Sequence, residues 1–273
     1  MKTRFLATPA AMVLAGWLLS SLFVPAMAQS TAAATAQTAT GMPAVPVRPV
    51  EATSTLPALS TAAPLPALLP AYVRWQGSLA AFAKADKERL PGTDGVLFVG
   101  SSTIRLWENM AQDFRDVPVI INRGFGGSTL ADCTVFVREL VTQYKPRQVL
   151  VYAGDNDLAQ GQSPEQVLQS FVDFVRNVRA DLPGTRITYI SIKPSPLRKS
   201  LMPKTEKTNA LIAQYAQTMP DIGYIDIYTP MLDATGNPKP EIFRSDRLHL
   251  NEAGYRLWQA HIADYLALHR VKP

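Results

Sequence analysis

Cysteine and histidine are scarce in this chain, and their scarcity argues against several kinds of site. The 273 residues include one cysteine, Cys133, and three histidines. A single cysteine excludes an intramolecular disulfide, and Cys133 is expected to be a small buried side chain in a helix. Two of the three histidines fall in the last predicted helix, so no group of histidines and cysteines has the spacing of a metal site. The sequence therefore predicts no bound metal.

The glycine-rich loops that hold nucleotide phosphates are missing as well. The segment GFGGST supplies Gly124 and Gly126, but Thr129 stands where a dinucleotide-binding loop needs its third glycine. No G-x-x-x-x-G-K-[ST] segment occurs. The G-x-S-x-G turn of α/β-hydrolases is absent too, because Ile104 occupies the position of its second glycine. We therefore expect neither an organic cofactor nor the α/β-hydrolase fold.

The chain also lacks a strong excess of charge of one sign. Its formal net charge is +5, and Lys2 and Arg4 lie in a segment that we expect to be removed, which leaves +3 (5 − 2). A basic balance this small does not indicate nucleic-acid binding.

The first 28 residues have the layout of a secretory signal peptide. Lys2 and Arg4 precede an apolar run of about 15 residues, 10–24, and the run is followed by Ala26-Met27-Ala28, small residues that suit cleavage. A permanent membrane span needs about 20 apolar residues. The segment 1–28 therefore predicts a signal peptide cleaved after Ala28, a periplasmic or secreted protein, and no stable membrane span after cleavage.

Residues 29–70 differ in composition from everything that follows. They are rich in Ala, Thr, Pro and Ser, with almost no charge and no aromatic residue. Such a segment has too little large apolar surface to build a core and is expected to be a disordered linker. The folded domain is therefore expected to span residues 71–273.

Beyond the linker, short apolar runs alternate with longer amphipathic segments. The apolar runs predict strands at 95–100, 118–122, 148–153, 186–192 and 224–227. The amphipathic segments predict helices at 103–110, 130–144, 164–181, 205–219 and 252–269, with a further helix at 72–89 packed outside the sheet. This alternation is typical of an α/β protein whose helices cover both faces of a parallel sheet. We expect a three-layer α/β/α sandwich with a five-stranded parallel sheet.

Small and polar residues follow most of the predicted strands. GSSTIRLW follows the first strand, NRGFGGSTL the second and AGDNDL the third, while SDRLHL comes just before the last helix. Ligands bind beyond the carboxyl ends of parallel strands, so these segments are expected to meet. Taken singly, each segment also has a plainer interpretation. The serines of GSSTIRLW, for example, have the position of residues that cap the next helix.

Asp246 and His249 form a sharper pair. Their spacing of three residues in a loop lets the carboxylate accept the imidazole Nδ1–H, which leaves Nε2 as a base. A histidine that caps the terminal helix or fills a polar gap is the alternative. Asp155 and Asp157, which flank Asn156, are expected to shape a tight turn by bonding their own backbone.

Together these segments resemble the sequence blocks of the SGNH, or GDSL-type, hydrolase family, over about residues 96–255. VGSSTI resembles the nucleophile block, NRGFGGST the glycine block, AGDNDL the asparagine block and SDRLHL the block of the acid and histidine. The likeness is greatest to the platelet-activating-factor acetylhydrolase-like branch and its secreted bacterial relatives. The resemblance implies a flavodoxin-like SGNH hydrolase fold and hydrolysis of acyl esters.

The resemblance also implies catalytic roles for individual residues. Ser102 matches the third residue of the Gly-Asp-Ser motif and is implied as the nucleophile. Ser101 replaces the aspartate of that motif, and we expect it to cap the helix or to support the oxyanion site through its backbone. His249, oriented by Asp246, is implied as the base that takes the serine proton.

An oxyanion that forms on the substrate needs hydrogen-bond donors already in place. By resemblance these are the backbone N–H groups of Ser102 and Gly127 and the side-chain amide of Asn156. Lys193 and Arg198 follow the fourth predicted strand. They belong to a solvated loop in one interpretation, and in the other they contact an acidic or phosphorylated substrate.

The function that these residues predict is that of an exported serine esterase. No long apolar lid segment lies near the motifs, which favours acetyl or similarly short esters of small molecules or carbohydrates. Two other functions stay open at this point. One is a periplasmic glycan O-acetyltransferase that uses the same serine, and the other is a glycan- or cell-wall-binding domain without catalysis.

Overall fold

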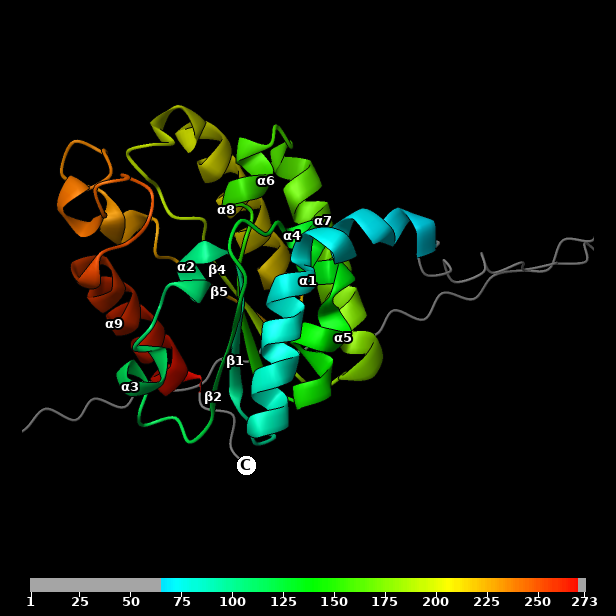
Figure 1. Ribbon diagram of the computed structural model, residues 1–273. Coiled ribbons are helices and arrows are strands. Elements are labelled where there is room, and N and C mark those ends of the chain that lie inside the picture. The colour runs from blue at the N-terminus through cyan, green and yellow to red at the C-terminus, as the bar shows by residue number, and fades with distance from the viewer. Residues whose placement is uncertain (1–64, 270–273) are drawn as a thin grey trace, which may run out of the picture. The chain divides into compact units, whose positions relative to one another are not determined.

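The computed structural model describes residues 65–269 (Figure 1). The predicted signal peptide, 1–28, and most of the predicted linker, 29–70, lie outside the described residues. The first helix, α1 (Leu65–Glu88), begins before the expected start at Tyr72.

Five parallel strands form one sheet in the order β2-β1-β3-β4-β5. The strands are β1 (Val96–Gly100), β2 (Ile120–Gly124), β3 (Gln148–Tyr152), β4 (Arg186–Ile190) and β5 (Ile222–Ile225). Each lies within two residues of its predicted start. The order is that of flavodoxin-like folds, in which the chain reverses direction across the sheet between β1 and β3. The predicted five-stranded parallel sheet is therefore confirmed.

Helices cover both faces of this sheet, as Figure 1 shows. The remaining α-helices are α2 (Ser102–Arg105), α3 (Met110–Asp113), α4 (Leu130–Val135), α5 (Val137–Leu140), α6 (Asp155–Ala159), α7 (Pro164–Asp181), α8 (Met202–Gln217) and α9 (Glu252–Leu268). Four single 3-10 turns are η1 (Thr142–Tyr144), η2 (Lys199–Leu201), η3 (Thr229–Met231) and η4 (Pro240–Ile242). Among the described residues, no helix is both long enough and apolar enough to cross a membrane.

The strands bury both of their faces, and alternate side chains enter two separate cores. On β1, Leu97 and Val99 belong to the core under α4, α5, α7 and α8. Phe98, between them, belongs to the core that contains Trp107 and Trp258, under α2, α3 and α9. Alternation across a strand produces this division, because successive side chains point to opposite faces. The predicted three-layer sandwich is confirmed.

Two predicted helices are interrupted. The segment expected as one helix over 130–144 divides into α4, α5 and η1, because Phe136 leaves helical geometry with φ −103° and ψ 24°. The Phe136 side chain is fully buried against Phe125 and Tyr72. Similarly, the segment expected over 103–110 is helical only at its two ends, in α2 and α3. The apolar periodicity continues through both interruptions, and at Phe136 the tertiary packing of the side chain accounts for the break.

The N-terminal helix α1 packs against the domain through aromatic and ionic contacts. Trp75 is buried and meets Phe125 edge to face, with 5.0 Å between ring centroids. Farther along α1, Asp86 pairs with Arg123 of β2 at 2.5 Å. Helix α1 is thereby held against the sheet edge that carries β2.

Candidate active site

The first strand ends in a turn that only glycine allows. Gly100 has φ +143°, and a Cβ there would lie 1.8 Å from the Tyr152 carbonyl oxygen of β3. This closeness lets Ser101 N–H donate to the same oxygen at 3.0 Å, which ties the turn to the neighbouring strand. Ser102 then begins α2. Ser101 stands at the N-cap position of α2, as expected, where its carbonyl accepts the Ile104 N–H at 3.0 Å, but its buried side chain makes no capping hydrogen bond.

Strand β2 fixes the position of α2 from the other side. Asn122 Nδ2 donates to the Ile104 carbonyl at 2.9 Å, and Asn122 Oδ1 accepts the Gly124 N–H at 2.9 Å. A Cβ on Gly124 would lie 2.2 Å from the backbone nitrogen of Arg105, so only glycine fits at position 124. Sequence reasoning missed Asn122, although a carboxamide at the end of the predicted strand 118–122 is the signal that could have found it.

The C-terminal loop brings a histidine and an aspartate to Ser102. His249 Nε2 lies 3.0 Å from Ser102 Oγ, and His249 Nδ1 lies 2.7 Å from Asp246 Oδ2. The other carboxylate oxygen, Oδ1, accepts the backbone N–H groups of Leu248 and His249, both at 2.9 Å. The predicted residues thus form one hydrogen-bonded chain from carboxylate to hydroxyl.

The hydrogen bonds around Asp246 keep its carboxylate charged. Desolvation by itself would raise the pKa of Asp246, but the hydrogen bonds from His249 and from two backbone N–H groups outweigh it and lower the pKa to about 2. An ionised Asp246 accepts the Nδ1–H and leaves Nε2 free to face Ser102. Helix α9, which follows this loop, is fastened to α2, since Tyr255 OH donates to the Thr103 carbonyl at 2.9 Å.

The predicted oxyanion residues line the same cavity as Ser102 and His249. This cavity of about 520 Å³ is bounded by Gly127 and Asn156, among others. Gly127 has φ +83°, a conformation that favours glycine. Asn156 lies in α6, which follows β3, and Figure 1 shows α2 and α6 near the same end of the sheet. The structure therefore brings together Ser102, Gly127, Asn156, Asp246 and His249.

Comparison with known protein families identifies the family of this chain. Residues 93–257 match the GDSL-like lipase/acylhydrolase family. The chain belongs to that family. The resemblance found in the sequence blocks is confirmed, whereas no curated protein matches this GDSL-family chain significantly.

Solved structures share the fold of this GDSL-family chain. A Streptococcus pneumoniae protein assigned as a platelet activating factor is 19% identical, with a TM-score of 0.63, and the match covers 74% of this chain and 97% of that one. A Bacteroides fragilis protein assigned as an acylhydrolase is 24% identical, with a TM-score of 0.62 and coverage of 72% and 97%. Axe2, an acetylxylan esterase from Geobacillus stearothermophilus, is 14% identical, with a TM-score of 0.55 and coverage of 67% and 98%.

Lys193 and Arg198, the two predicted substrate-binding residues, both reach Asp155. Lys193 Nζ lies 3.0 Å from Asp155 Oδ2, and Arg198 Nη1 lies 2.6 Å from Asp155 Oδ1. Burial alone would raise the pKa of Asp155, but the two cations outweigh it and lower the pKa. The Lys193 side chain is only 1% exposed, so the hypothesis that it contacts an anionic substrate is not supported. Asp155 pairs with cations, where only turn bonds to its own backbone had been predicted.

Asp157 also acts beyond its own turn. Its two carboxylate oxygens accept the Leu130 N–H at 3.0 and 3.2 Å, at the start of α4. Asp157 is fully buried, and this burial raises its pKa to about 6. The carboxyl group therefore connects helix α6, which carries Asn156, to the start of α4, three residues after Gly127.

Arg105 and Ser78 line the cavity and were not predicted as site residues. Arg105 ends α2 and is exposed, and its Nε would lie 2.7 Å from a Cβ on Gly126. Within residues 65–269, no acid forms an ion pair with Arg105. Its position in the sequence, three residues after Ser102, is the signal that could have predicted its place in the cavity. Ser78 comes from α1, and its approach depends on tertiary packing that no motif records.

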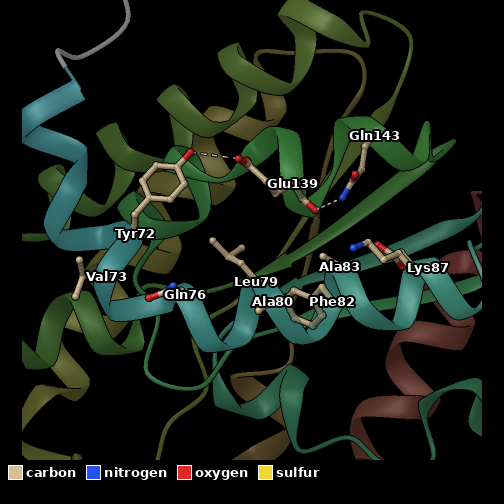
Figure 2. Close-up of a pocket in the computed structure, with 11 residues that line it drawn as sticks. Tyr72, Val73, Gln76, Leu79, Ala80, Phe82, Ala83, Lys87, Glu139 and Gln143 are labelled. Carbon is tan, nitrogen blue, oxygen red and sulfur yellow. Dashed lines mark hydrogen bonds between the residues drawn. The ribbon is translucent and has the colours of Figure 1, made fainter.

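A larger cavity lies away from these residues, along α1 (Figure 2). Its volume is about 770 Å³, and its lining includes Leu79 and Phe82 of α1. Figure 2 shows the Tyr72 hydroxyl pointing toward Glu139, to which it donates at 3.2 Å. The described lining of this larger cavity holds no cysteine, serine or histidine, whereas Ser102 and His249 line the smaller cavity.

In the described part of the chain, no three His, Cys, Asp or Glu side chains gather as metal ligands. Cys133 is fully buried in α4, where burial raises the pKa of its thiol, in line with its predicted packing role.

Proposed function

We propose that this GDSL-family chain is an exported serine esterase that hydrolyses short-chain acyl esters, acetyl esters in particular. One observation carries the proposal: the hydrogen-bonded chain of Asp246, His249 and Ser102, with separations of 2.7 and 3.0 Å. These are the contacts that an activated serine needs.

In the proposed mechanism, His249 Nε2 accepts the Ser102 proton while Oγ attacks the ester carbonyl. The resulting imidazolium is stabilised by Asp246, which stays ionised because its pKa is about 2. The same histidine then gives the proton to the leaving alcohol. Water, activated by His249, releases the acyl group from Ser102 and restores the enzyme.

The developing oxyanion is proposed to bind the backbone N–H groups of Ser102 and Gly127 and the Asn156 amide. All three residues line the cavity of about 520 Å³, which supports the proposal that they bind the same oxygen atom. A single donor of this kind is worth on the order of 3 kcal/mol of transition-state stabilisation. Three convergent donors are therefore a substantial part of the proposed catalysis.

The proposed substrate is a small acyl ester, on a small molecule or a carbohydrate. Among the described residues that line the cavity, only Leu248 has an apolar side chain, which supports a short acyl group over a long one. The structural likeness to Axe2, an acetylxylan esterase, supports an acetyl ester of a carbohydrate. Export rests on the predicted signal peptide, 1–28, which lies outside the described residues.

The test is initial-rate hydrolysis of p-nitrophenyl acetate, butyrate and octanoate by the mature domain, beside Ser102→Ala. We expect turnover to fall with chain length and to vanish in the variant. Labelling by a serine-directed phosphonate, lost in Ser102→Ala, checks the nucleophile independently. Labelling without hydrolysis of any ester would favour transfer of an acetyl group to a glycan. The absence of both would favour a glycan-binding domain without catalysis.

A further inference from the structure

The orientation of the Asn156 amide decides whether it helps or opposes the proposed reaction. The two ends of a carboxamide have nearly the same shape, but Nδ2 donates hydrogen bonds and Oδ1 only accepts them. If the amide were turned by 180°, Oδ1 would replace Nδ2 and would repel a developing oxyanion. The site therefore needs a device that selects one orientation.

Two contacts select the same orientation. Arg198 Nη2 donates to Asn156 Oδ1 at 3.1 Å, and a guanidinium has donors only, so it pairs only with the amide oxygen. At the other end, Asn156 Nδ2 donates to the Ser128 carbonyl at 3.0 Å. A backbone carbonyl only accepts, so it pairs only with the amide nitrogen. Ser128 directly follows Gly127, and Nδ2 is thereby held beside the proposed oxyanion donor.

Arg198 is itself held by a largely buried network. Its Nη1 lies 2.6 Å from Asp155 Oδ1, and Lys193 Nζ occupies the other oxygen, Oδ2, at 3.0 Å. Lys193 is held in turn by the Tyr152 hydroxyl of β3, at 3.2 Å. The planar guanidinium group thus contacts two consecutive residues, Asp155 and Asn156. A lysine, whose single charge sits on a flexible stem, reproduces this pair of contacts poorly.

We propose that Arg198, anchored by Asp155, which Lys193 holds in place, is a positioning residue that orients the Asn156 amide toward the oxyanion. This inference rests on the proposed esterase function. It replaces the hypothesis that Arg198 binds an anionic substrate. Two cations and one carboxylate leave one net positive charge in the network, next to the position where negative charge would develop.

The experiment is a double-mutant cycle with Arg198→Met and Asn156→Ala, in which kcat and KM for p-nitrophenyl acetate are measured. If Arg198 acts through Asn156, its loss should cost at most as much as loss of the donor, roughly 100-fold in kcat. We expect a fall of roughly 10- to 100-fold in Arg198→Met with little change in KM. In the Asn156→Ala background the same substitution should change kcat less than threefold.

Two controls keep the cycle interpretable. Arg176→Met removes an arginine from an exposed ion pair with Asp173 on α7, and it should leave kcat unchanged in both backgrounds. Arg198→Lys keeps the charge beside Asp155 and provides a second cycle if Arg198→Met does not fold. Its loss of kcat should also disappear in the Asn156→Ala background.

The outcomes separate this inference from the esterase proposal. Losses that multiply in the double variant would overturn the positioning role, and so would a change confined to KM. A wild-type enzyme without Ser102-dependent hydrolysis would instead overturn the esterase function on which the inference rests.

Discussion

Asp157 should give this fold a stability that decreases as the pH rises from 4 to 6. Its pKa is raised from 3.8 to about 6, chiefly because burial disfavours the charged carboxylate. A group whose pKa is higher in the folded chain than in the unfolded chain stabilises the fold fully below the unfolded value. That contribution is lost as pH rises through the folded value. The window for Asp157 is therefore about pH 4 to pH 6.

The magnitude follows from the size of the shift. A difference of about 2 pKa units, at about 1.4 kcal/mol per unit, corresponds to about 3 kcal/mol. Asp157→Asn keeps the shape and an oxygen for the Leu130 N–H, but it does not titrate. Between pH 4 and pH 7, the free energy of unfolding of the variant should therefore rise by about 3 kcal/mol relative to wild type. Urea unfolding at each pH measures this difference.

The result that would refute the reasoning is a difference between the two proteins that does not depend on pH. It would mean that the two hydrogen bonds from Leu130 compensate fully for burial of the charge. Asp173→Asn is the matched control, because Asp173 lies on the surface of α7 in an ion pair with Arg176. A pH-dependent difference that Asp157→Asn shows beyond that of Asp173→Asn belongs to the buried carboxyl group of Asp157.

Four further predictions concern the site. Asn156→Ala should lower kcat roughly 100-fold for p-nitrophenyl acetate with little change in the melting temperature; near wild-type turnover would remove Asn156 from the mechanism. Asp246→Asn should lower kcat by a factor on the order of 10⁴, because the neutral amide no longer fixes the His249 tautomer; unchanged turnover would contradict that role. Gly127→Ala should cost roughly 1 kcal/mol of stability in urea unfolding because φ is +83° there, although space for the methyl group is available. Arg105→Glu should lower kcat/KM for the anionic ester 4-acetoxybenzoate by a factor at least ten times larger than for the neutral ester p-nitrophenyl acetate, because Arg105 is an exposed cation that lines the cavity. Equal losses for the two esters would exclude an electrostatic role.

Most of the fold could be predicted from the sequence because the sheet is buried on both faces. Strands such as VLFVG at 96–100 are continuous apolar runs, and the amphipathic segments between them have helical periodicity. Boundaries were harder to predict. The break at Phe136 depends on where its side chain packs, and the short helix α6 contains Asp155 and Asn156, which favour turns.

The nucleophile, histidine and acid of the proposed mechanism could be predicted for a different reason. Ser102, Asp246 and His249 follow strands or precede a helix within short recognisable blocks. The supporting residues have no such blocks. Lys193 stands in a loop, which suggested exposure, and its partner Asp155 is 38 residues earlier in the chain. Pairing across that distance depends on β3 and β4 lying side by side, which the sequence alone does not state.

The reach of the C-terminal loop has a consequence for the order in which the protein becomes active during folding. Ser102 is part of the sheet's first turn, whereas His249 is 147 residues later and joins it only when the last helix docks. The Tyr255–Thr103 hydrogen bond, which fastens that helix, spans 152 residues. Contacts between such distant residues form late, because a long loop must close first. In a refolding experiment, recovery of enzymatic activity should therefore lag behind burial of the sheet, and turnover would serve as a clock for the final docking step.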